Sequence, residues 1–225
     1  PQWNGESDLH FSAKVKEGKL VGTILGSNAK AYSFEGKRAP KLIRSNPVTF
    51  GKAIPIFNKT NLNGWQPEYP NRKNQWLVDN GILVNTKSGI NLLTTDTYED
   101  FKLHIEARIP KGSNSGIYLR GRYEVQVEDS YGKDPSNILF GAVYGFLTPN
   151  EMAANPAGEW QVFDITLIGR RVTVIANGKT IINDQIIPGI TGGAIDSNEA
   201  SKGPLMLQGD HGKVEYRNIT IRKGE

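Results

Sequence analysis

The sequence predicts an all-β protein, built as a two-sheet antiparallel β-sandwich or jelly roll. About a dozen short stretches alternate apolar and polar residues with the period of two that is typical of half-buried strands. Turn signals separate them at close spacing, drawn from 25 Gly and 12 Pro. No segment carries a sustained helical period, so we expect low helical content.

The start of the chain is predicted to form a short N-terminal β-hairpin extension and a connector. Residues 9–15 and 19–25 are expected to be strands around the turn Glu17-Gly18. Residues 28–47 are basic and rich in turn residues, which favours a connector. Because the composition changes near residue 54, we divide the chain into residues 1–52 and a main domain of residues 53–225.

The first half of the main domain contains the clearest strand signals. Residues 76–78 and 82–84 flank Asp79-Asn80-Gly81, a strong tight-turn signal. A further short strand is expected at residues 91–94. Residues 101–109 alternate most regularly, with the inward positions Phe101, Leu103, Ile105, Ala107 and Ile109.

The second half alternates long loops with strands. Residues 131–156 are irregular, with a possible helical turn near Glu151, and loops of that length are uncommon unless functional. A three-strand meander is expected over residues 160–187, and another long loop follows it. Residues 205–208 and 214–221 are expected to close the chain as a hairpin.

The stretch from Tyr123 to Asp129 is the centre of the functional argument. Its odd positions, Tyr123, Val125 and Val127, are predicted to enter a core shared with residues 163, 165 and 167. Its even positions present a carboxylate, an amide and a carboxylate on the other face. Such a row either lines a sugar-binding cleft, with nearby Arg side chains pairing with the acids, or is a solvated strand with incidental ion pairs.

Composition excludes several classes of protein. The chain has no Cys, which excludes disulfides, thiolate nucleophiles and Cys-based metal sites. The net charge of +4 is spread without a Lys/Arg run, so we infer no nucleic-acid binding. No stretch is apolar enough for a transmembrane segment.

The candidate catalytic groups are few. Glu124 and Glu128 share one strand face, but their Cα atoms would be ~13 Å apart, which is long for a glycosidase acid pair. His211 lies beside Asp210 in a Gly-flanked turn, and it is either a general acid/base or a loop His in water. Loop acids such as Asp129 would suit Ca²⁺, although solvated acids are the simpler interpretation.

Several motifs occur together in one order and resemble the 3-keto-disaccharide hydrolase domain family over residues ~54–223. The motifs are Phe57-Asn58…Leu62-Asn63-Gly64-Trp65, Asn114-Ser115-Gly116-Ile117-Tyr118-Leu119-Arg120-Gly121, Tyr123-Glu124-Val125-Gln126-Val127, Gly141-Ala142-Val143-Tyr144, Pro156-Ala157-Gly158-Glu159-Trp160, Asn177-Gly178 and His211-Gly212-Lys213-Val214-Glu215-Tyr216-Arg217-Asn218-Ile219.

This resemblance implies a concanavalin A-like jelly roll that acts on glycosides already oxidised at C3. It implies export to the periplasm or cell surface, and a separate oxidoreductase that makes the 3-keto sugar. The expected catalytic residues are Glu124, His211 and Arg120, with Arg120 beside Glu124. The expected substrate-binding residues are Asn114, Gln126, Asp129, Tyr144, Glu159, Trp160 and Gln208.

Laminarinase-type relatives of the fold carry their acids as Glu-x-Asp-x-x-Glu on one strand. Here Gln126 stands at the middle position and Asp129 at the last, so a standard retaining glycosidase is not expected. A 3-keto substrate permits other chemistry, because the carbonyl acidifies the C2 proton. A base, an acid and an enolate stabiliser would suffice, and a divalent metal ion could be the stabiliser.

Two other functions fit the same sequence. A jelly roll hosts lectins as readily as enzymes, so the chain could be a non-catalytic carbohydrate-binding module. It could also be an interaction domain of the cell envelope. Product formation from a 3-keto-glycoside separates these classes.

Overall fold

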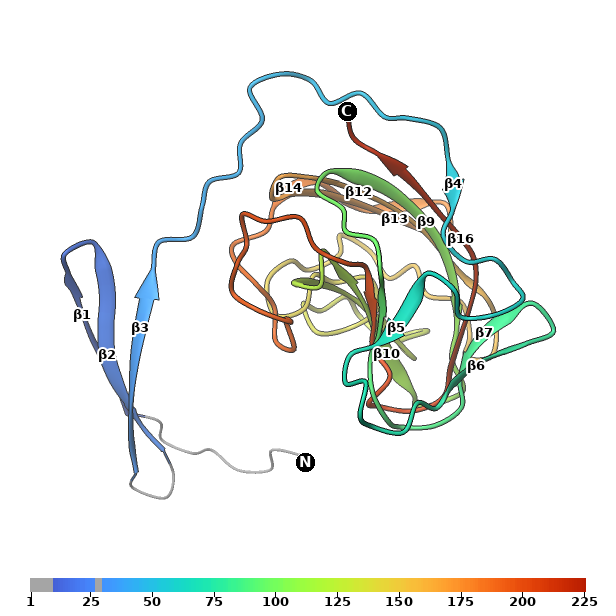
Figure 1. Cartoon of the computed structure of the whole chain (residues 1–225), viewed down its shortest axis with the longest axis horizontal. Coiled ribbons are helices and arrows are strands. Elements are labelled where there is room, and N and C mark those ends of the chain that lie inside the picture. The colour runs from blue at the N-terminus through green and yellow to red at the C-terminus, as the bar shows by residue number, and fades with distance from the viewer. Residues whose placement is uncertain (1–9, 27–29) are drawn as a thin grey trace. The chain divides into compact units, whose positions relative to one another are not determined.

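The computed structural model describes residues 10–26 and 30–225, and the chain divides into two units, residues 1–40 and residues 41–225. The N-terminal unit is an antiparallel sheet in the order β1-β2-β3 (Figure 1). Its strands are β1 (His10–Lys16), β2 (Lys19–Leu25) and β3 (Ala31–Lys37). The predicted hairpin is confirmed for the described positions, whereas Leu9 and Asn28 lie outside them.

The prediction of a connector over residues 28–47 was wrong for its middle part. Residues 31–37 form a third strand, which pairs with β2 along its full length. Tyr32 and Phe34 alternate with polar residues there, and Tyr32 lies opposite Ile24. The alternation of apolar and polar residues is short here and is surrounded by turn-forming and basic residues, so it did not indicate a strand.

The main unit, residues 41–225, is a sandwich of two antiparallel sheets, and the predicted two-sheet jelly roll is confirmed. The smaller sheet has the order β11-β10-β15-β8-β5. Its strands are β5 (Trp65–Pro67), β8 (Leu92–Thr94), β10 (Asn114–Leu119), β11 (Tyr123–Glu128) and β15 (Met206–Leu207).

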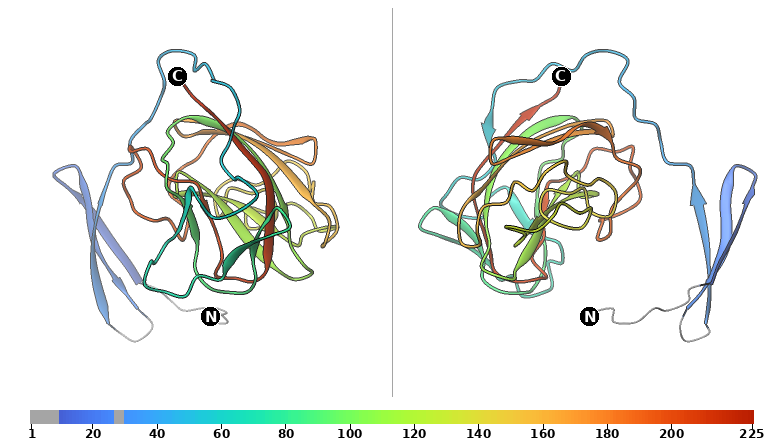
Figure 2. Two further views of the ribbon diagram at one scale, coloured as in Figure 1. Left: turned by 45° about the vertical axis from the view of Figure 1, so that its right-hand side comes forward. Right: turned by 180° about the vertical axis from the view of Figure 1, so that it is seen from behind.

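The larger sheet has the order β14-β13-β12-β9-β16-β7-β6, and β4 pairs with β16 beside that path. Both views of Figure 2 show this sheet curving around the smaller one. Its strands are β4 (Ile54–Pro55), β6 (Trp76–Asp79), β7 (Ile82–Asn85), β9 (Phe101–Arg108), β12 (Gln161–Ile168), β13 (Arg171–Ala176), β14 (Lys179–Ile186) and β16 (Val214–Lys223).

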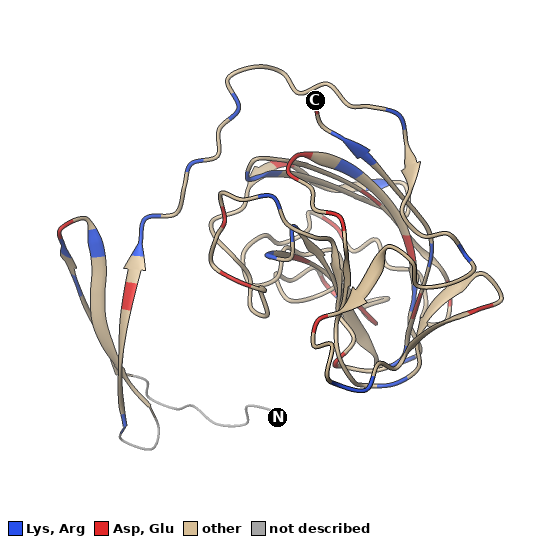
Figure 3. Cartoon of the chain, viewed as in Figure 1, with Lys and Arg blue, Asp and Glu red and all other residues tan. Residues whose placement is uncertain are grey.

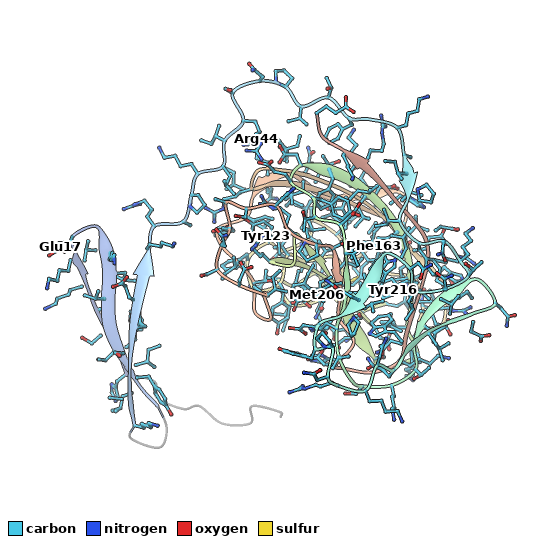
Figure 4. All side chains as sticks on the ribbon, in the orientation of Figure 1. Glu17, Arg44, Tyr123, Phe163, Met206 and Tyr216 are labelled. Carbon is cyan, nitrogen blue, oxygen red and sulfur yellow. The ribbon has the colours of Figure 1, made fainter. Side chains whose placement is uncertain are left out.

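The core lies between the sheets and follows the predicted alternation. The inward positions of residues 101–109 are all buried, as are Tyr123, Val125 and Val127 on β11. Phe163 packs against Phe140, with ring centroids 5.0 Å apart. Figure 4 shows Tyr123, Phe163, Met206 and Tyr216 inside the main unit. Alternation therefore identified the buried face of the long strands.

Two local predictions were wrong. No helical turn forms near Glu151, nor is any helix present elsewhere in residues 10–26 and 30–225. The closing strands are not a hairpin, because β15 belongs to the smaller sheet and β16 to the larger one. The segment between them, residues 208–213, crosses from one sheet to the other, which carries its side chains past the end of the sandwich.

The outer edge of β11 is covered by two loops instead of a strand. Ala142 accepts a hydrogen bond from the Gln126 N–H, and the Tyr144 N–H donates to the Glu124 carbonyl. From the other loop, the Thr191 N–H donates to the Arg122 carbonyl, and the Thr191 Oγ1 accepts from the Glu124 N–H at 3.0 Å. These bonds hold residues 139–147 and 189–203 against the polar side of the sheet.

Charges of both signs are interspersed over the ribbon (Figure 3). On the outer face of the larger sheet they pair across strands, as in Arg217–Glu106 at 2.7 Å and Arg108–Glu215 at 2.5 Å. No helix in the described part of the chain is long and apolar enough to cross a membrane.

We expect Phe163→Ala to lower the free energy of unfolding by about 3–5 kcal/mol, because it opens a cavity beside Phe140 in the core. Ile186→Ala is the control. Ile186 is 57% exposed on the same sheet, so its truncation should change stability by less than about 0.5 kcal/mol. Urea unfolding of both variants checks this, and equal losses would contradict the assigned core.

Candidate active site

The polar face of β10 and β11 forms the floor of a pocket of about 270 Å³, which we call the Glu124 pocket. Its walls come from residues 192–193, residues 208–211 and Tyr144. Six of the predicted site residues meet here. The lining residues are Asn114, Tyr118, Glu124, Gln126, Tyr144, Gly192, Gly193, Gln208, Asp210 and His211.

Glu124 is the most enclosed acid of the pocket. It is only 4% exposed, and it faces away from the core because its neighbours Tyr123 and Val125 face inward. Its carboxyl group lies over Gly116 on β10, where a Cβ atom would come within 2.4 Å of the Glu124 Oε1. Glycine at position 116 therefore makes the room in which this carboxyl group sits.

Tyr118 is the direct partner of Glu124. Its Oη lies 2.9 Å from the Glu124 Oε2 and 2.9 Å from the Gly192 carbonyl oxygen. The hydroxyl has one proton for these two acceptors. If Glu124 is protonated, it can donate to Tyr118, and Tyr118 can then donate to Gly192. When Glu124 is ionised, the Tyr118 hydroxyl donates to the Glu124 Oε2, and its single proton is then not available to the Gly192 carbonyl.

The pKa of the Glu124 carboxyl group is raised well above its usual value. Burial raises its pKa to about 7, the Tyr118 hydrogen bond opposes this shift, and the charge of Asp210 adds to it. Burial disfavours the charged carboxylate, and no cation is among the groups that affect its pKa. A carboxyl group with a pKa near neutrality can both accept and donate a proton under physiological conditions.

Three amide side chains that line the pocket have buried acceptors without a partner in the described part of the chain. The Asn114 Oδ1, Gln126 Oε1 and Gln208 Oε1 atoms are buried and find no hydrogen-bond partner among the described residues. The Gln126 side chain is held by its Nε2, which donates to the Ile138 carbonyl at 3.2 Å. Buried acceptors of this kind are costly unless a ligand supplies donors, and sugar hydroxyl groups would do so.

His211 and Asp210 lie in contact with each other in the lining of the pocket. The His211 Nδ1 lies 2.6 Å from the Asp210 Oδ1, which leaves Nε2 as the nitrogen free for another partner. Asn85 holds this segment, because its Nδ2 donates to the carbonyls of Gly209 at 3.0 Å and Gly212 at 2.5 Å. Residues 208–213, which cross from one sheet to the other, thus place His211 in the Glu124 pocket.

Arg120 does not lie beside Glu124, and that prediction was wrong. Its backbone adopts φ +53° in the turn between β10 and β11, and its Nη2 donates to the Gly169 carbonyl at 2.7 Å and to the Tyr123 Oη at 3.1 Å. The side chain is fully buried, and burial lowers its pKa. The positive φ turns the side chain toward the β12–β13 turn, so Arg120 is a structural group here.

Three other predicted residues lie outside the Glu124 pocket. Asp129 lines a neighbouring pocket and accepts a hydrogen bond from the Gly112 N–H at 2.9 Å. Trp160 contacts the guanidinium groups of Arg108 and Arg217, whose Cζ atoms lie 4.5 and 3.9 Å from its ring centroid. Glu159 is exposed just before β12. Cation–π contacts on the larger sheet therefore occupy the tryptophan that was a candidate sugar platform.

Sequence reasoning missed Tyr118 and Gly192. No alternation marked residues 114–119 as a strand, and the partner of Tyr118 depends on the β10–β11 register, in which Tyr118 is opposite Glu124. Gly192 belongs to a long loop whose path no periodicity reveals. A divalent metal ion as enolate stabiliser stays a prediction. Within residues 10–26 and 30–225, no group of three His, Asp or Glu side chains that could hold a metal ion is found.

Residues 52–222 match the model of the 3-keto-alpha-glucoside-1,2-lyase-like domain. A 3-keto-disaccharide hydrolase of Bacteroides thetaiotaomicron is 28% identical over 121 residues, which are 49% of this chain and 40% of that protein. The match thus spans less than half of the length of this relative.

Solved structures show the same fold. A candidate glycosyl hydrolase of Parabacteroides distasonis superposes with a TM-score of 0.64 at 29% identity, covering 80% of this chain and 92% of that one. A second structure from that organism gives a TM-score of 0.59 at 26% identity, covering 77% and 100%.

We expect Gly116→Ala to displace the Glu124 carboxyl group, because the new Cβ would lie 2.4 Å from its Oε1. The variant should melt at a lower temperature, and NMR titration of the Glu124 carboxyl should show a pKa closer to 4.5. Gly189→Ala is the matched control, since its nearest neighbouring atom is 3.9 Å away. An unchanged Glu124 titration in Gly116→Ala would refute the packing described here.

The Glu124 carboxyl should also make stability depend on pH. Its folded pKa is raised, so its stabilising contribution is complete below about pH 4.5 and is lost as the pH rises through about 7. Glu124→Gln stays neutral at every pH. Its free energy of unfolding, relative to the wild type, should therefore rise by up to about 3 kcal/mol between about pH 4 and pH 8. Urea unfolding over this range measures the difference, and a constant offset would contradict the shifted pKa.

Proposed function

The chain belongs to the 3-keto-alpha-glucoside-1,2-lyase-like domain family, and we propose that it cleaves 3-keto-glycosides by general acid/base chemistry. The observation that carries this proposal is the buried Glu124 carboxyl, whose pKa is raised to about 7 inside a small polar pocket. The pocket volume of about 270 Å³ is at the low end for ligand sites, which suits a single sugar ring.

Glu124 is the proposed base. A carbonyl at C3 acidifies the proton on C2, so the Glu124 carboxylate takes that proton and the C2–H electron pair forms the enolate. The proton moves to the carboxyl group whose contacts with Tyr118 and Gly192 are complete only when Glu124 is protonated. Tyr118 donates to the Glu124 Oε2, which favours the ionised carboxylate, and it is therefore a positioning residue for the base.

His211 is the proposed acid for the leaving group. The enolate electrons return to form the C1–C2 double bond, and the C1–O bond breaks. The leaving oxygen takes a proton from the His211 Nε2, while Asp210 holds Nδ1 at 2.6 Å and stabilises the charged ring. Water then adds across C1–C2, so elimination followed by hydration gives overall hydrolysis.

The C3 oxygen needs hydrogen-bond donors as it gains negative charge. With Arg120 directed to the Gly169 carbonyl, this role falls to the side chains that line the pocket. The amides of Asn114 and Gln208 and the hydroxyl of Tyr144 are the neutral donors there, and the amide oxygens receive the sugar hydroxyls. A separate oxidoreductase must supply the C3 carbonyl, because the proposed chemistry starts from the ketone.

We expect wild-type protein to release product from methyl 3-keto-glucoside, and Glu124→Gln to reduce kcat by about 10²–10⁴-fold, as for loss of a general base. In the wild type, kcat/KM should fall as the pH drops below about 7, because Glu124 must be ionised to act. Chromatography of the product at a series of pH values measures both effects.

Glu151→Gln is the control for this experiment. Glu151 is an exposed partner of Lys179 outside the pocket, so its variant should keep wild-type activity. Full activity in Glu124→Gln would reject the assigned base. Sugar binding without product in the wild type would instead identify a carbohydrate-binding module.

A further inference from the structure

A second and larger pocket, of about 670 Å³, opens where β11 ends. We call it the Tyr131 pocket; it is lined by the loop of residues 111–114, by Glu128 and Asp129, by Tyr131 and Lys133, and by Pro156 and Ala157. None of the catalytic groups proposed above lies in it. Its size and position therefore raise the question of what it binds.

The two pockets share a wall. Asn114 lines both of them, and it lies opposite Glu128 in the β10–β11 register. The side chains of Glu124, Gln126 and Glu128 follow one another on the same face of β11, over ~13 Å between the first and last Cα atoms. One polar strip thus runs from the base, past the unpartnered Asn114 Oδ1, into the Tyr131 pocket.

Tyr131 offers an aromatic surface at this end of the strip. It is 61% exposed although its neighbour Ser130 is fully buried. The turn that carries it is fixed, because the Ser130 Oγ accepts a hydrogen bond from the Phe140 N–H and the Ser130 carbonyl accepts one from Lys133. An exposed ring on a fixed turn next to polar groups suits the apolar face and the hydroxyls of a sugar.

The charges around the Tyr131 pocket favour a neutral ligand. The positive charges of Lys111 and Lys133 are balanced by the negative charges of Glu128 and Asp129. The Lys133 Nζ lies 3.6 Å from the Glu128 Oε1. The facing loops are tied together, since Asp129 accepts from the Gly112 N–H and donates its own N–H to the Ser113 carbonyl at 3.2 Å. The pocket is therefore preformed, polar and close to electrically neutral.

We propose that the Tyr131 pocket is the subsite for the leaving sugar, and that Tyr131 is a specificity-determining residue that stacks on that ring. The inference rests on the proposed function, because it places the 3-keto ring in the Glu124 pocket. The substrate class is then a 3-keto-disaccharide, whose unmodified second ring passes Asn114 and lies on Tyr131. A 3-keto-glucoside with a methyl group in place of the second ring makes none of these contacts.

Binding to a catalytically impaired protein tests the subsite without requiring turnover. In the Glu124→Gln background, calorimetry should show a 3-keto-disaccharide binding about tenfold more tightly than methyl 3-keto-glucoside. Adding Tyr131→Ala should remove this advantage, whereas Tyr131→Phe keeps the ring and should retain it. Tyr69→Ala is the control, because Tyr69 is 47% exposed and stacks on Arg72 outside both pockets.

Turnover by the wild type separates this inference from the proposed function. If methyl 3-keto-glucoside is cleaved but Tyr131→Ala leaves the binding advantage intact, the subsite is refuted and the proposed function stands. If nothing is cleaved but the advantage depends on Tyr131, Tyr131 binds the second ring as proposed, while the proposed reaction and the leaving-group role of that ring are refuted. Absence of both cleavage and a binding advantage overturns both.

Discussion

The free edge of β11 is the constraint on which the rest of the site depends. β11 is the last strand of the smaller sheet, so the backbone groups on its outer side have no strand beside them. Residues 139–147 and 189–203 supply the missing hydrogen bonds at Arg122, Glu124 and Gln126. The same bonds place Tyr144 and Gly192 in the lining of the Glu124 pocket, so the loops that cover the edge also build the pocket.

The separation of Arg120 from Glu124 explains the electrostatics of the site. A guanidinium next to Glu124 would lower the pKa of the carboxyl and make it a weak base. Instead Arg120 is buried near Gly169 and Tyr123, and the Tyr123 hydroxyl donates to Glu199 at 2.7 Å. Among the described residues, the hydrogen-bond partner of the Glu124 carboxyl group is the Tyr118 hydroxyl, so burial dominates and raises the Glu124 pKa to about 7. Keeping the cation away is what makes the carboxyl group useful near neutral pH.

Much of the fold could be predicted because the alternation of apolar and polar residues along a strand can be read from neighbouring positions in the sequence. Residues 101–109 and 123–128 showed their buried faces directly, and Asn80-Gly81 and Asn177-Gly178 form the expected turns with positive φ. The third strand of the N-terminal unit and the crossing at residues 208–213 were missed, because strand pairing depends on partners distant in the chain.

The sequence by itself determined which side chains of β11 face away from the core, since a period of two leaves only one choice once Val125 is inside. It therefore placed Glu124 and Gln126 on the polar face. Only the tertiary structure decided what meets them there. The sheet register places Tyr118 opposite Glu124, and the segment that crosses between the sheets places His211 in the pocket. Arg120 has a positive φ, and its side chain lies away from Glu124. These outcomes depend on long-range packing and on one backbone angle, and neither is encoded in local periodicity.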